Sequence, residues 1–535
     1  MACVAGVKDA KASKHTGERA FIGDGKKILE EDDVGGVNTA FAMIMEKRKP
    51  NPWGKGHIQL YILATVCFLN STMSGFDGSL MGSINVLDNF TSYYGLAQNG
   101  AASTGIVFAI FQVGQMCAAL FVWVADWLGR KWLIFIGAAG VALGTVLLRA
   151  DGLFGQPALP GRGGAAAVPR HAGGHVQHFY YFGSILATSA VYGAHKHLSH
   201  TDLDWRLPLW LQMVCPGIVA VLIMLFPESP RWLVGKDRHE EARAFLVKYH
   251  ANGDADHPLV DLGMSEMIES LRVEPITEWR NFFDLRVLVR TRARRYRTML
   301  NVVFAWFGQF SGNNVVSYYM PYLLDNVGIK DDDTKLLLNI MYALEGYIFA
   351  TAGARMHDVI GRRKMLLGAT AGLILSLAVA AGTAAGYEHT GSRAASSASI
   401  AFIFVFGAVF ACAFTSMQPI YPAEVMSNDM RAKGMGTYKI AGGAAGFVNT
   451  FVAPIALARG RYWVYVFFVF WDCFELAFMY FFFVETKGLT LEEMDGIFEA
   501  RDPRKASTRR KKKVMVRKLG GAEGKVGDET GVSEK

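Results

Sequence analysis

The sequence is poor in charged residues and in cysteine for a chain of its length. Asp, Glu, Lys and Arg make up 19% of the 535 residues, whereas 51% are hydrophobic. The six cysteines are scattered, with no CxxC pair and no metal-ligand spacing, so we interpret them as reduced packing residues. We find no nucleophile, metal-ligand or phosphate-binding constellation either. We therefore expect no catalytic residues, no metal, no cofactor and no enzyme activity.

The first residues also lack the features of a removable signal peptide. Residues 1–56 are polar and contain no short apolar core followed by a small-residue cleavage site, so we predict a cytoplasmic N-terminal tail. The formal net charge is +8, but the lysines and arginines lie at the edges of hydrophobic blocks, where basic residues orient membrane spans. The basic excess therefore marks the cytoplasmic face, and we expect no nucleic-acid partner.

What the sequence does contain is long apolar blocks. A hydrocarbon core of ~30 Å needs roughly 20 largely apolar residues per helix. Eleven segments meet this length, some only just: residues 58–84, 101–125, 131–148, 179–192, 207–226, 299–324, 336–356, 365–385, 399–419, 438–457 and 464–484. The sequence therefore predicts an all-α polytopic protein whose partner is the lipid bilayer.

The order of these blocks predicts two membrane halves. We place an N-terminal transmembrane bundle at 57–226, a cytoplasmic linker with short helices at 227–298, a C-terminal transmembrane bundle at 299–484, and a basic cytoplasmic tail at 485–535. The linker is rich in charges of both signs and contains the basic run RTRARRYR, which is typical of a cytoplasmic connection.

One segment, Arg149–His178, does not fit this order. It carries glycine, proline, arginine and histidine where a span is expected, and its prolines interrupt any helix. The basic loop Ala125–Lys131 and the linker should both lie inside, yet only three predicted spans separate them. Either the segment is an unusual extracellular loop, or it is a gene-model fault, such as a shifted frame or a misplaced splice, that has overwritten one span and part of the next.

Internal repetition supports the two halves. The pattern Asp-x-x-Gly-Arg followed by a basic residue occurs at 126–131 and again at 358–363, each time after the second span of its half. PESPRW closes the first half, and VETKG closes the second. The second half also carries AEVMSNDMRAKG at 423–434, which has no counterpart in the first half. The segment at 149–178 occupies the place where that counterpart is expected.

Taken together, these motifs resemble the sugar porter family of the major facilitator superfamily, and within it the fungal lactose-permease-like and hexose transporter group. The resemblance covers roughly Trp53–Phe498, apart from Arg149–His178. It rests on GFDGSLMGSI, DWLGRK, PESPRWL, GQFSGNNVVSYY, DVIGRRK, YPAEVMSNDMRAKG and VETKGLTLEE. It implies a major facilitator fold of two six-helix bundles, with twelve spans in the family and about eleven good spans here.

The function implied by the resemblance is transport of a sugar, a mono- or disaccharide, together with a proton by alternating access. The expected partners are the sugar, the proton and the bilayer, and the expected form is a monomer in a fungal-like plasma membrane. Three alternatives stay open: a facilitative sugar uniporter, a nutrient sensor, and a nonfunctional transporter-like protein.

Asp77 is the candidate proton-coupling residue. It lies within the first predicted span, where an ionised carboxylate is costly and usually functional. Proton-coupled members of the family carry an aspartate at the matching position, and its arginine partner lies in the fourth span, which is not recognisable here. The alternative is that Asp77 is a helix-end residue at the outer interface.

Sugar recognition needs amide and hydroxyl groups together with an aromatic face. Residues 308–319 supply such a set, and the resemblance matches Gln309 and Asn314 to sugar-binding positions and the two tyrosines that follow to the outer gate. The alternative for each amide is a hydrogen bond between packed helices. The candidate substrate-binding residues are Gln309, Asn313, Asn314, Tyr318, Tyr319, Gln418, Tyr421 and Asn449.

The repeated charged motifs predict a cytoplasmic gate, because a short loop between two helices can pair its charges with each other and with helix ends. The alternative for Arg130 is that it only orients the chain in the membrane. The candidate gate residues are Asp126, Arg130, Glu228, Arg231, Asp358, Arg362, Glu424, Arg431 and Glu485. Four further charged residues lie in or near predicted spans. Each is either a functional site or a residue near a helix end whose side chain reaches the membrane interface: Glu345, Lys439, Asp472 and Glu475.

Overall fold

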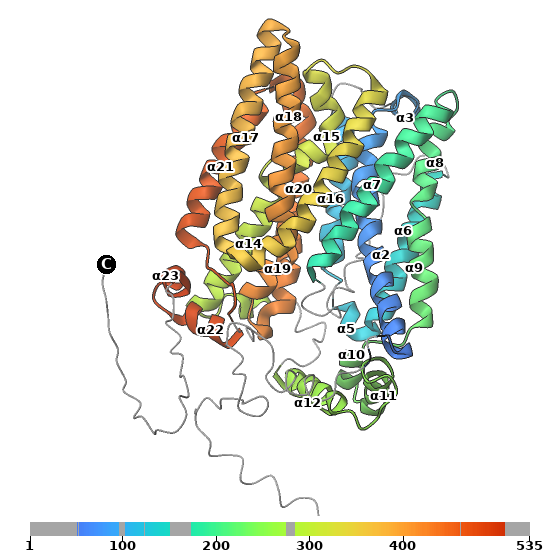
Figure 1. The fold of residues 1–535 in the computed structure, drawn as a ribbon, viewed down its shortest axis with the longest axis vertical. Helices are drawn as coiled ribbons and strands as arrows, with labels where there is room; N and C mark the ends of the chain where they lie inside the picture. The colour runs from blue at the N-terminus through green and yellow to red at the C-terminus, as the bar shows by residue number, and fades with distance from the viewer. Residues whose placement is uncertain are drawn as a thin grey trace, which may run out of the picture.

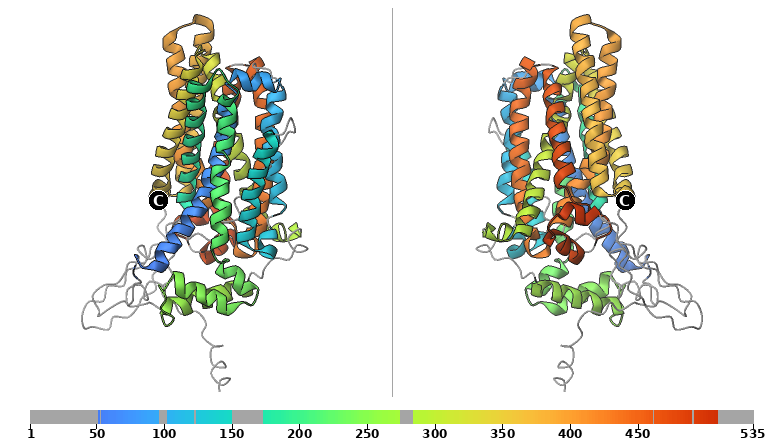
Figure 2. Two further views of the ribbon diagram at one scale, coloured as in Figure 1. Left: turned by 90° about the vertical axis from the view of Figure 1, so that its right-hand side faces the viewer. Right: turned by 90° about the vertical axis from the view of Figure 1, so that its left-hand side faces the viewer.

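The structure is a computed structural model that describes residues 51, 53–95, 102–121, 123–149, 173–273, 284–460, 462–489 and 491–508. Within these residues all regular structure is helical. The chain is a multi-pass membrane protein with two groups of long helices that run roughly parallel, and short helices gather below one end (Figures 1 and 2).

The first group of long helices contains residues 55–225. Its members are α2 (Lys55–Ile84), α4 (Ala102–Ala119), α6 (Arg130–Arg149), α7 (Gly173–Leu198), α8 (Leu203–Leu211) and α9 (Val214–Leu225), with short α3 (Asp88–Tyr93) and α5 (Val124–Leu128) beside them. Helix α2 packs against α7 and α9, and α6 packs against α9. Because Pro208 and Pro216 lack a backbone N–H, the span made by α8 and α9 is interrupted near Gln212.

The second group contains residues 292–482. Its members are α14 (Arg292–Phe310), α15 (Asn313–Asn326), α16 (Asp332–Ile360), α17 (Arg362–Thr390), α18 (Arg393–Phe410), the π-helical turn η4 (Ala411–Thr415), α19 (Ser416–Val425), α20 (Asn428–Gly460) and α21 (Trp463–Phe482). Helix α14 ends where Gly312 adopts φ +92°, a conformation that favours glycine. The largest hydrophobic core of the described residues lies mainly within this group and extends to Met494 and Phe498.

The short helices are α10 (Pro230–Gly235), α11 (His239–Tyr249), α12 (Pro258–Val273), the 3₁₀ turn η3 (Leu285–Leu288), α22 (Leu491–Glu499) and α23 (Pro503–Thr508). Helices α10–α12 lie below the first group, and α22 and α23 lie below the second (Figure 1). The positive-inside rule predicts that this end faces the cytoplasm.

In the described residues, each of the eleven predicted spans is largely helical, and seven of the described helices are long and apolar enough by composition to cross a membrane. Large apolar side chains such as Leu225, Leu375 and Phe470 face outward, as expected for helices solvated by lipid. The all-α membrane architecture predicted from the sequence is therefore confirmed.

The segment Arg149–His178 requires a correction at both of its ends. Arg149 is the last residue of α6, and α7 already begins at Gly173, so the predicted span at 179–192 is too short. No proline follows Pro169 in this segment, and the helix can therefore extend back through Gly173. Residues 150–172, on which the choice between a loop and a gene-model fault depends, lie outside the described residues.

Candidate functional site

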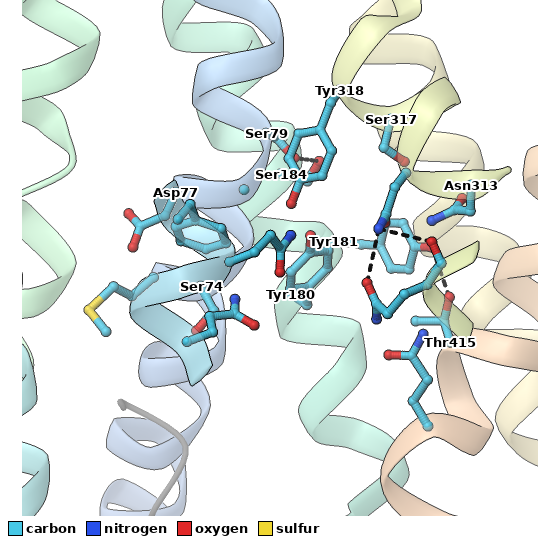
Figure 3. Close-up of a pocket in the computed structure, with 18 of the residues that line it drawn as sticks. Ser74, Asp77, Ser79, Tyr180, Tyr181, Ser184, Asn313, Ser317, Tyr318 and Thr415 are labelled. Atoms are coloured by element: carbon cyan, nitrogen blue, oxygen red, sulfur yellow. Dashed lines mark hydrogen bonds between the residues drawn. The ribbon is translucent and has the colours of Figure 1, made fainter. Parts of the chain in front are cut away.

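A central cavity of about 350 Å³ lies where the two groups of helices meet. It is lined from α2, α4, α6 and α7 on one side and from α14, α15, α16 and α20 on the other. Figure 3 shows Asp77 at one side of the pocket and Asn313, Ser317 and Thr415 at the other. A small polar molecule in this cavity would contact both halves of the protein.

Asp77 lies two helical turns before the end of α2 and lines this cavity. Only 9% of Asp77 and 4% of Gln212 are exposed. The Gln212 side-chain Nε2 donates a hydrogen bond of 2.7 Å to Asp77 Oδ1. The position within the helix argues against a helix-end role at the outer interface. The arginine partner that the resemblance implies falls on residues outside the described ranges.

The polar cluster around Gln309 forms the opposite wall. Asn314 Nδ2 donates to the backbone carbonyl of Gln309 at 3.1 Å and to its side-chain Oε1 at 3.0 Å. Asn449 Nδ2 donates to the same carbonyl at 2.8 Å. The helix break at Gly312 leaves the Gln309 carbonyl without its regular backbone hydrogen bond, and the side-chain amides of Asn314 and Asn449 donate to it instead. The Gln309 side chain is thereby fixed beside the cavity.

The predicted substrate-binding residues divide into two groups. Five line the cavity: Gln309, Asn313, Asn314, Tyr318 and Gln418. Three lie behind its wall: Tyr319, Tyr421 and Asn449. The hydroxyl of Tyr319 donates to the carbonyl of Thr450 at 2.8 Å, and that of Tyr421 donates to the carbonyl of Val484 at 3.3 Å. This second group therefore supports the wall in the described geometry.

Several lining residues were not singled out from the sequence. They are Gln112, Gln115, Tyr180, Tyr181, Ser184, Gln212, Tyr342 and Thr415. The two glutamines of α4 were a visible signal, because two amides three residues apart in an apolar span lie on one side of a helix. Tyr181 and Thr415 form a hydrogen bond of 3.2 Å between the two halves, which no local pattern indicates.

The outer end of the cavity is bridged by contacts between the halves. Asn339 Nδ2 of α16 donates to Ser83 Oγ of α2 at 2.8 Å, and Lys196 pairs with Asp333 at 3.3 Å. A Cβ on Gly82 would approach the carbonyl of Ser317 to 3.0 Å, so α2 and α15 also pack closely here. These contacts hold the two halves together at the end away from α10–α12.

The loop that precedes α6 in the first half is held by Glu228. Its carboxylate accepts hydrogen bonds from the backbone N–H groups of Arg130 at 3.0 Å and Lys131 at 3.1 Å, at the start of α6. A negative charge at a helix N-terminus is favourable. Arg231 lies in α10, two residues after the Pro-Glu-Ser segment, and Asp126 lies in α5.

The second half repeats this arrangement. Glu485 accepts hydrogen bonds from the backbone N–H groups of Arg362 at 2.8 Å and Arg363 at 3.2 Å, at the start of α17. The preceding Gly361 adopts φ +102°, and a Cβ there would lie 2.7 Å from Glu485 Oε2. Equivalent carboxylates therefore cap equivalent helices in the two halves.

Arg362 also joins two further predicted gate residues. Its guanidinium pairs with the Glu424 carboxylate at 3.0 Å and 3.2 Å and with Asp358 at 2.9 Å. Arg431 donates to the carbonyl of Met426 at 3.3 Å, at the junction of α19 and α20. The structure thus brings Asp358, Arg362, Glu424 and Glu485 into one cluster below the second half.

The four remaining intramembrane charges have different surroundings. Lys439 of α20 lines the cavity, whereas Glu345 lies outside the set of lining residues. Asp472 and Glu475 are fully buried in α21, which packs on α17, and Trp471 donates a hydrogen bond to Glu475. Of these four charges, only Lys439 is placed to meet a molecule in the cavity.

Comparison with known families agrees with this architecture. The family model described as "Sugar (and other) transporter" matches residues 63–152 and 170–498. The chain belongs to this family. The predicted membership in the sugar porters of the major facilitator superfamily is therefore confirmed, and the unmatched residues 153–169 fall inside the anomalous segment.

The family match extends to individual proteins. A probable quinate permease of Aspergillus niger is 25% identical over 492 residues, which cover 85% of this chain and 90% of that protein. The hexose transporter HXT13 of Saccharomyces cerevisiae is 25% identical over 488 residues, with 83% of each chain covered.

Solved structures show the same fold. The proton:xylose symporter XylE bound to 6-bromo-6-deoxy-D-glucose superposes with a TM-score of 0.64 at 19% identity, covering 82% of this chain and 99% of that one. The inward-open form of XylE from E. coli gives a TM-score of 0.63 at 19% identity, covering 82% of this chain and 100% of that one. The chain therefore has the major facilitator fold.

Proposed function

We propose that the protein carries a sugar, a mono- or disaccharide, across the plasma membrane together with a proton by alternating access. The observation that supports this most is the central cavity, which places the Asp77 carboxylate on one half and the Gln309 amide cluster on the other. A molecule bound between the halves is exposed to one side or the other as the halves rock.

The proton is assigned to Asp77. This carboxylate is almost fully buried, lies in the cavity, and is held by the neutral side chain of Gln212. An acid in the membrane interior avoids the cost of an isolated charge by binding a proton. A glutamine amide can remain paired with either form of the acid, because it offers one donor group and one acceptor group.

The sugar is assigned to the lining amides. Gln309 and Gln418 can each donate and accept hydrogen bonds, as a ring hydroxyl requires, and the side-chain oxygen of Asn314 can accept one. Tyr180 and Tyr318 supply aromatic faces for the apolar side of the ring. The names of the relatives agree with a small polyhydroxylated substrate: they include a hexose transporter, quinate permeases and a xylose symporter.

Alternating access is assigned to the contacts at the two ends. The Ser83–Asn339 and Lys196–Asp333 contacts join the two halves at the outer end, and alternating access requires these contacts to break when that end opens. When the outer end opens, the charged clusters around Glu228 and Arg362 would meet and close the inner end. We propose that the protein does this as a monomer.

The test is uptake into proteoliposomes that contain the purified full chain. We would measure labelled glucose, xylose, lactose and quinate with and without an inward proton gradient, and record external alkalinisation on addition of each compound. Asp77→Asn should abolish gradient-driven accumulation but retain exchange of labelled for unlabelled substrate at equal pH. Exchange needs substrate binding and rocking but no change in protonation.

Two outcomes would overturn parts of the proposal. Substrate-driven alkalinisation that Asp77→Asn leaves unchanged would remove Asp77 as the proton site. Uptake that is indifferent to the proton gradient in the wild type would indicate a uniporter. A chain that is well folded but shows neither flux nor exchange for any compound would point to a sensor or to a nonfunctional protein.

A further inference from the structure

The last two described helices, α22 and α23, form a strap of residues 491–508 below the second group of long helices (Figure 1). Arg297, near the start of α14, is buried and pairs with Asp495 of α22 at 2.6 Å. Its guanidinium group also lies 4.3 Å from the ring centroid of Phe498. These contacts attach α22 firmly to the second half, and α23 follows directly after it.

Ser507 connects α23 to the Glu485 cap of α17. Its hydroxyl oxygen accepts a hydrogen bond from the backbone N–H of Glu485 at 3.2 Å, and its hydroxyl group donates to the carbonyl of Arg504 at 2.8 Å. The Glu485 carboxylate in turn accepts from the backbone N–H groups of Arg362 and Arg363. A chemical change at Ser507 therefore acts directly on the residue that caps α17.

The residues before Ser507 form a charge pattern that protein kinases recognise. Arg504 and Lys505 place basic side chains three and two positions before the hydroxyl. Kinases with acidic substrate grooves select such a pattern. Helix α23 has only six residues and is too short to be stable alone, so the half-buried Ser507 becomes accessible when this turn unwinds. The positive-inside rule predicts that this end faces the cytoplasm, where ATP is available.

Two arginines lie where a phosphate on Ser507 needs positive charge. Arg504 precedes Ser507 by three residues and therefore shares a face of α23 with it. Arg504 and Arg363 both donate to the backbone carbonyl of Tyr480, at 3.4 Å and 2.8 Å, so their guanidinium groups lie close together. The Nε of Arg363 is buried and has no hydrogen-bond partner among the described residues. A phosphate oxygen supplies the kind of acceptor that this group lacks.

We propose that a protein kinase selective for basic sequences phosphorylates Ser507, and that the phosphate fixes the strap to the start of α17. In this step Ser507 Oγ bonds to the γ-phosphorus of ATP, the bond from that phosphorus to the bridging oxygen breaks, ADP leaves, and the hydroxyl proton passes to a carboxylate of the kinase. This modification goes beyond the proposed transport function.

The charge balance around Ser507 favours binding of the phosphate. It carries close to two negative charges and offers strong acceptor oxygens to Arg363, to Arg504 and to the N–H of Glu485. The repulsion from the Glu485 carboxylate is weakened, because four backbone N–H groups already donate to that carboxylate. The bond from the Ser507 hydroxyl to the Arg504 carbonyl is lost, but it is a neutral one and weaker than a charged contact.

The first test is phosphorylation of the purified, folded full chain. The probe is the catalytic subunit of cyclic-AMP-dependent protein kinase with Mg²⁺ and ATP, and mass spectrometry locates the phosphate. The wild type should carry it on Ser507, and Ser507→Ala should carry none within the strap. Thr508→Ala is the matched control, because it removes the neighbouring hydroxyl, which donates only to carbonyls of its own helix, and it should be phosphorylated as fully as the wild type.

Hydrogen exchange then measures whether the strap is fixed. In the phosphorylated protein the backbone amides of α23 should exchange about tenfold more slowly, because a charge-assisted hydrogen bond is worth roughly that factor. Arg363→Gln lies outside the sequence that the kinase reads, so it should leave phosphorylation unchanged but remove most of this slowing. Lys364→Gln, which removes a charge from the exposed neighbour of Arg363, should leave both unchanged.

Three results would overturn the proposal. Phosphate on Thr508 in place of Ser507, or phosphorylation of the unfolded chain alone, would remove Ser507 as the site. Phosphorylation of Ser507 with unchanged or faster exchange of α23 would show that the phosphate does not fix the strap. Neither readout depends on flux through the carrier, so this inference and the transport function can fail separately.

Discussion

Replacing Gln212 by leucine should shift the pH dependence of uptake while leaving the carrier folded. The Gln212 amide donates to the Asp77 carboxylate at 2.7 Å, and both side chains are more than nine-tenths buried. Leucine is close to glutamine in size, so the hydrogen bond is lost without a large cavity. The pair also sits at the interruption between α8 and α9, where the local backbone is already irregular.

The size of the shift follows from the two hydrogen bonds that the amide can make. A hydrogen bond to a charged carboxylate contributes about 1.5–3 kcal/mol, and one to the neutral acid about 0.5–1.5 kcal/mol. The difference of about 1–1.5 kcal/mol is worth close to one pH unit, since 1.36 kcal/mol corresponds to one unit. Loss of Gln212 removes the larger bond from the ionised form, so protonation should occur at higher pH. The pH of half-maximal uptake should therefore rise by about one unit.

The assay is initial uptake into proteoliposomes over pH 5 to 9 at zero membrane potential. Gln115→Leu provides the matched control, because Gln115 lines the same cavity from α4. It should change the level of uptake without moving the half-maximal pH. A Gln212→Leu carrier that transports with an unchanged half-maximal pH would refute the assignment of Gln212 as the positioning partner of Asp77.

Two further variants test the support of the cavity and the cytoplasmic cap. Asn314→Ala should raise the KM for substrate about tenfold with a smaller change in maximal rate, because Gln309 loses two hydrogen bonds that fix it. A tenfold fall in the maximal rate with an unchanged KM would contradict this role. Gly361→Ala should destabilise the purified protein by about 1–3 kcal/mol in thermal unfolding, because φ is +102° and the added Cβ would meet Glu485. Gly368→Ala is the control, because a Cβ there meets nothing within 4 Å. Equal melting temperatures of the two variants would contradict this reasoning.

The helices could be predicted from the sequence because lipid imposes a simple rule. A run of roughly 20 apolar residues must form a helix to satisfy its backbone. The start of α7 was missed because Gly173–His178 is polar and follows a stretch with several prolines, so its composition indicated a loop. In the structure these residues continue α7, which packs against α2 and α16. Composition alone does not report such contacts between distant segments.

The site could be predicted only in part. Asp77 and the amides of residues 309–314 stood out because polar groups are rare within apolar spans. Gln212 was missed because its contact with Asp77 joins residues 135 apart in the sequence. Tyr421 was assigned to the cavity, but the π-helical turn η4 and the prolines at 419 and 422 shape this span, and its ring lies fully buried against Phe483. The facing of a side chain depends on such helix irregularities, which periodicity does not resolve.

The two cytoplasmic caps differ in one respect that bears on the transport cycle. Glu228 and Glu485 make the same pair of backbone hydrogen bonds, and glycines 129 and 361 leave room for them with φ near +100°. In the second half, Glu424 adds a bidentate contact to Arg362, and it belongs to a motif that the sequence repeats nowhere in the first half. Because bidentate charged contacts are among the stronger hydrogen bonds, Glu424 adds to the hold of Glu485 on this loop. A substitution at Glu485 should therefore leave the loop partly held, because Arg362 keeps a second carboxylate partner.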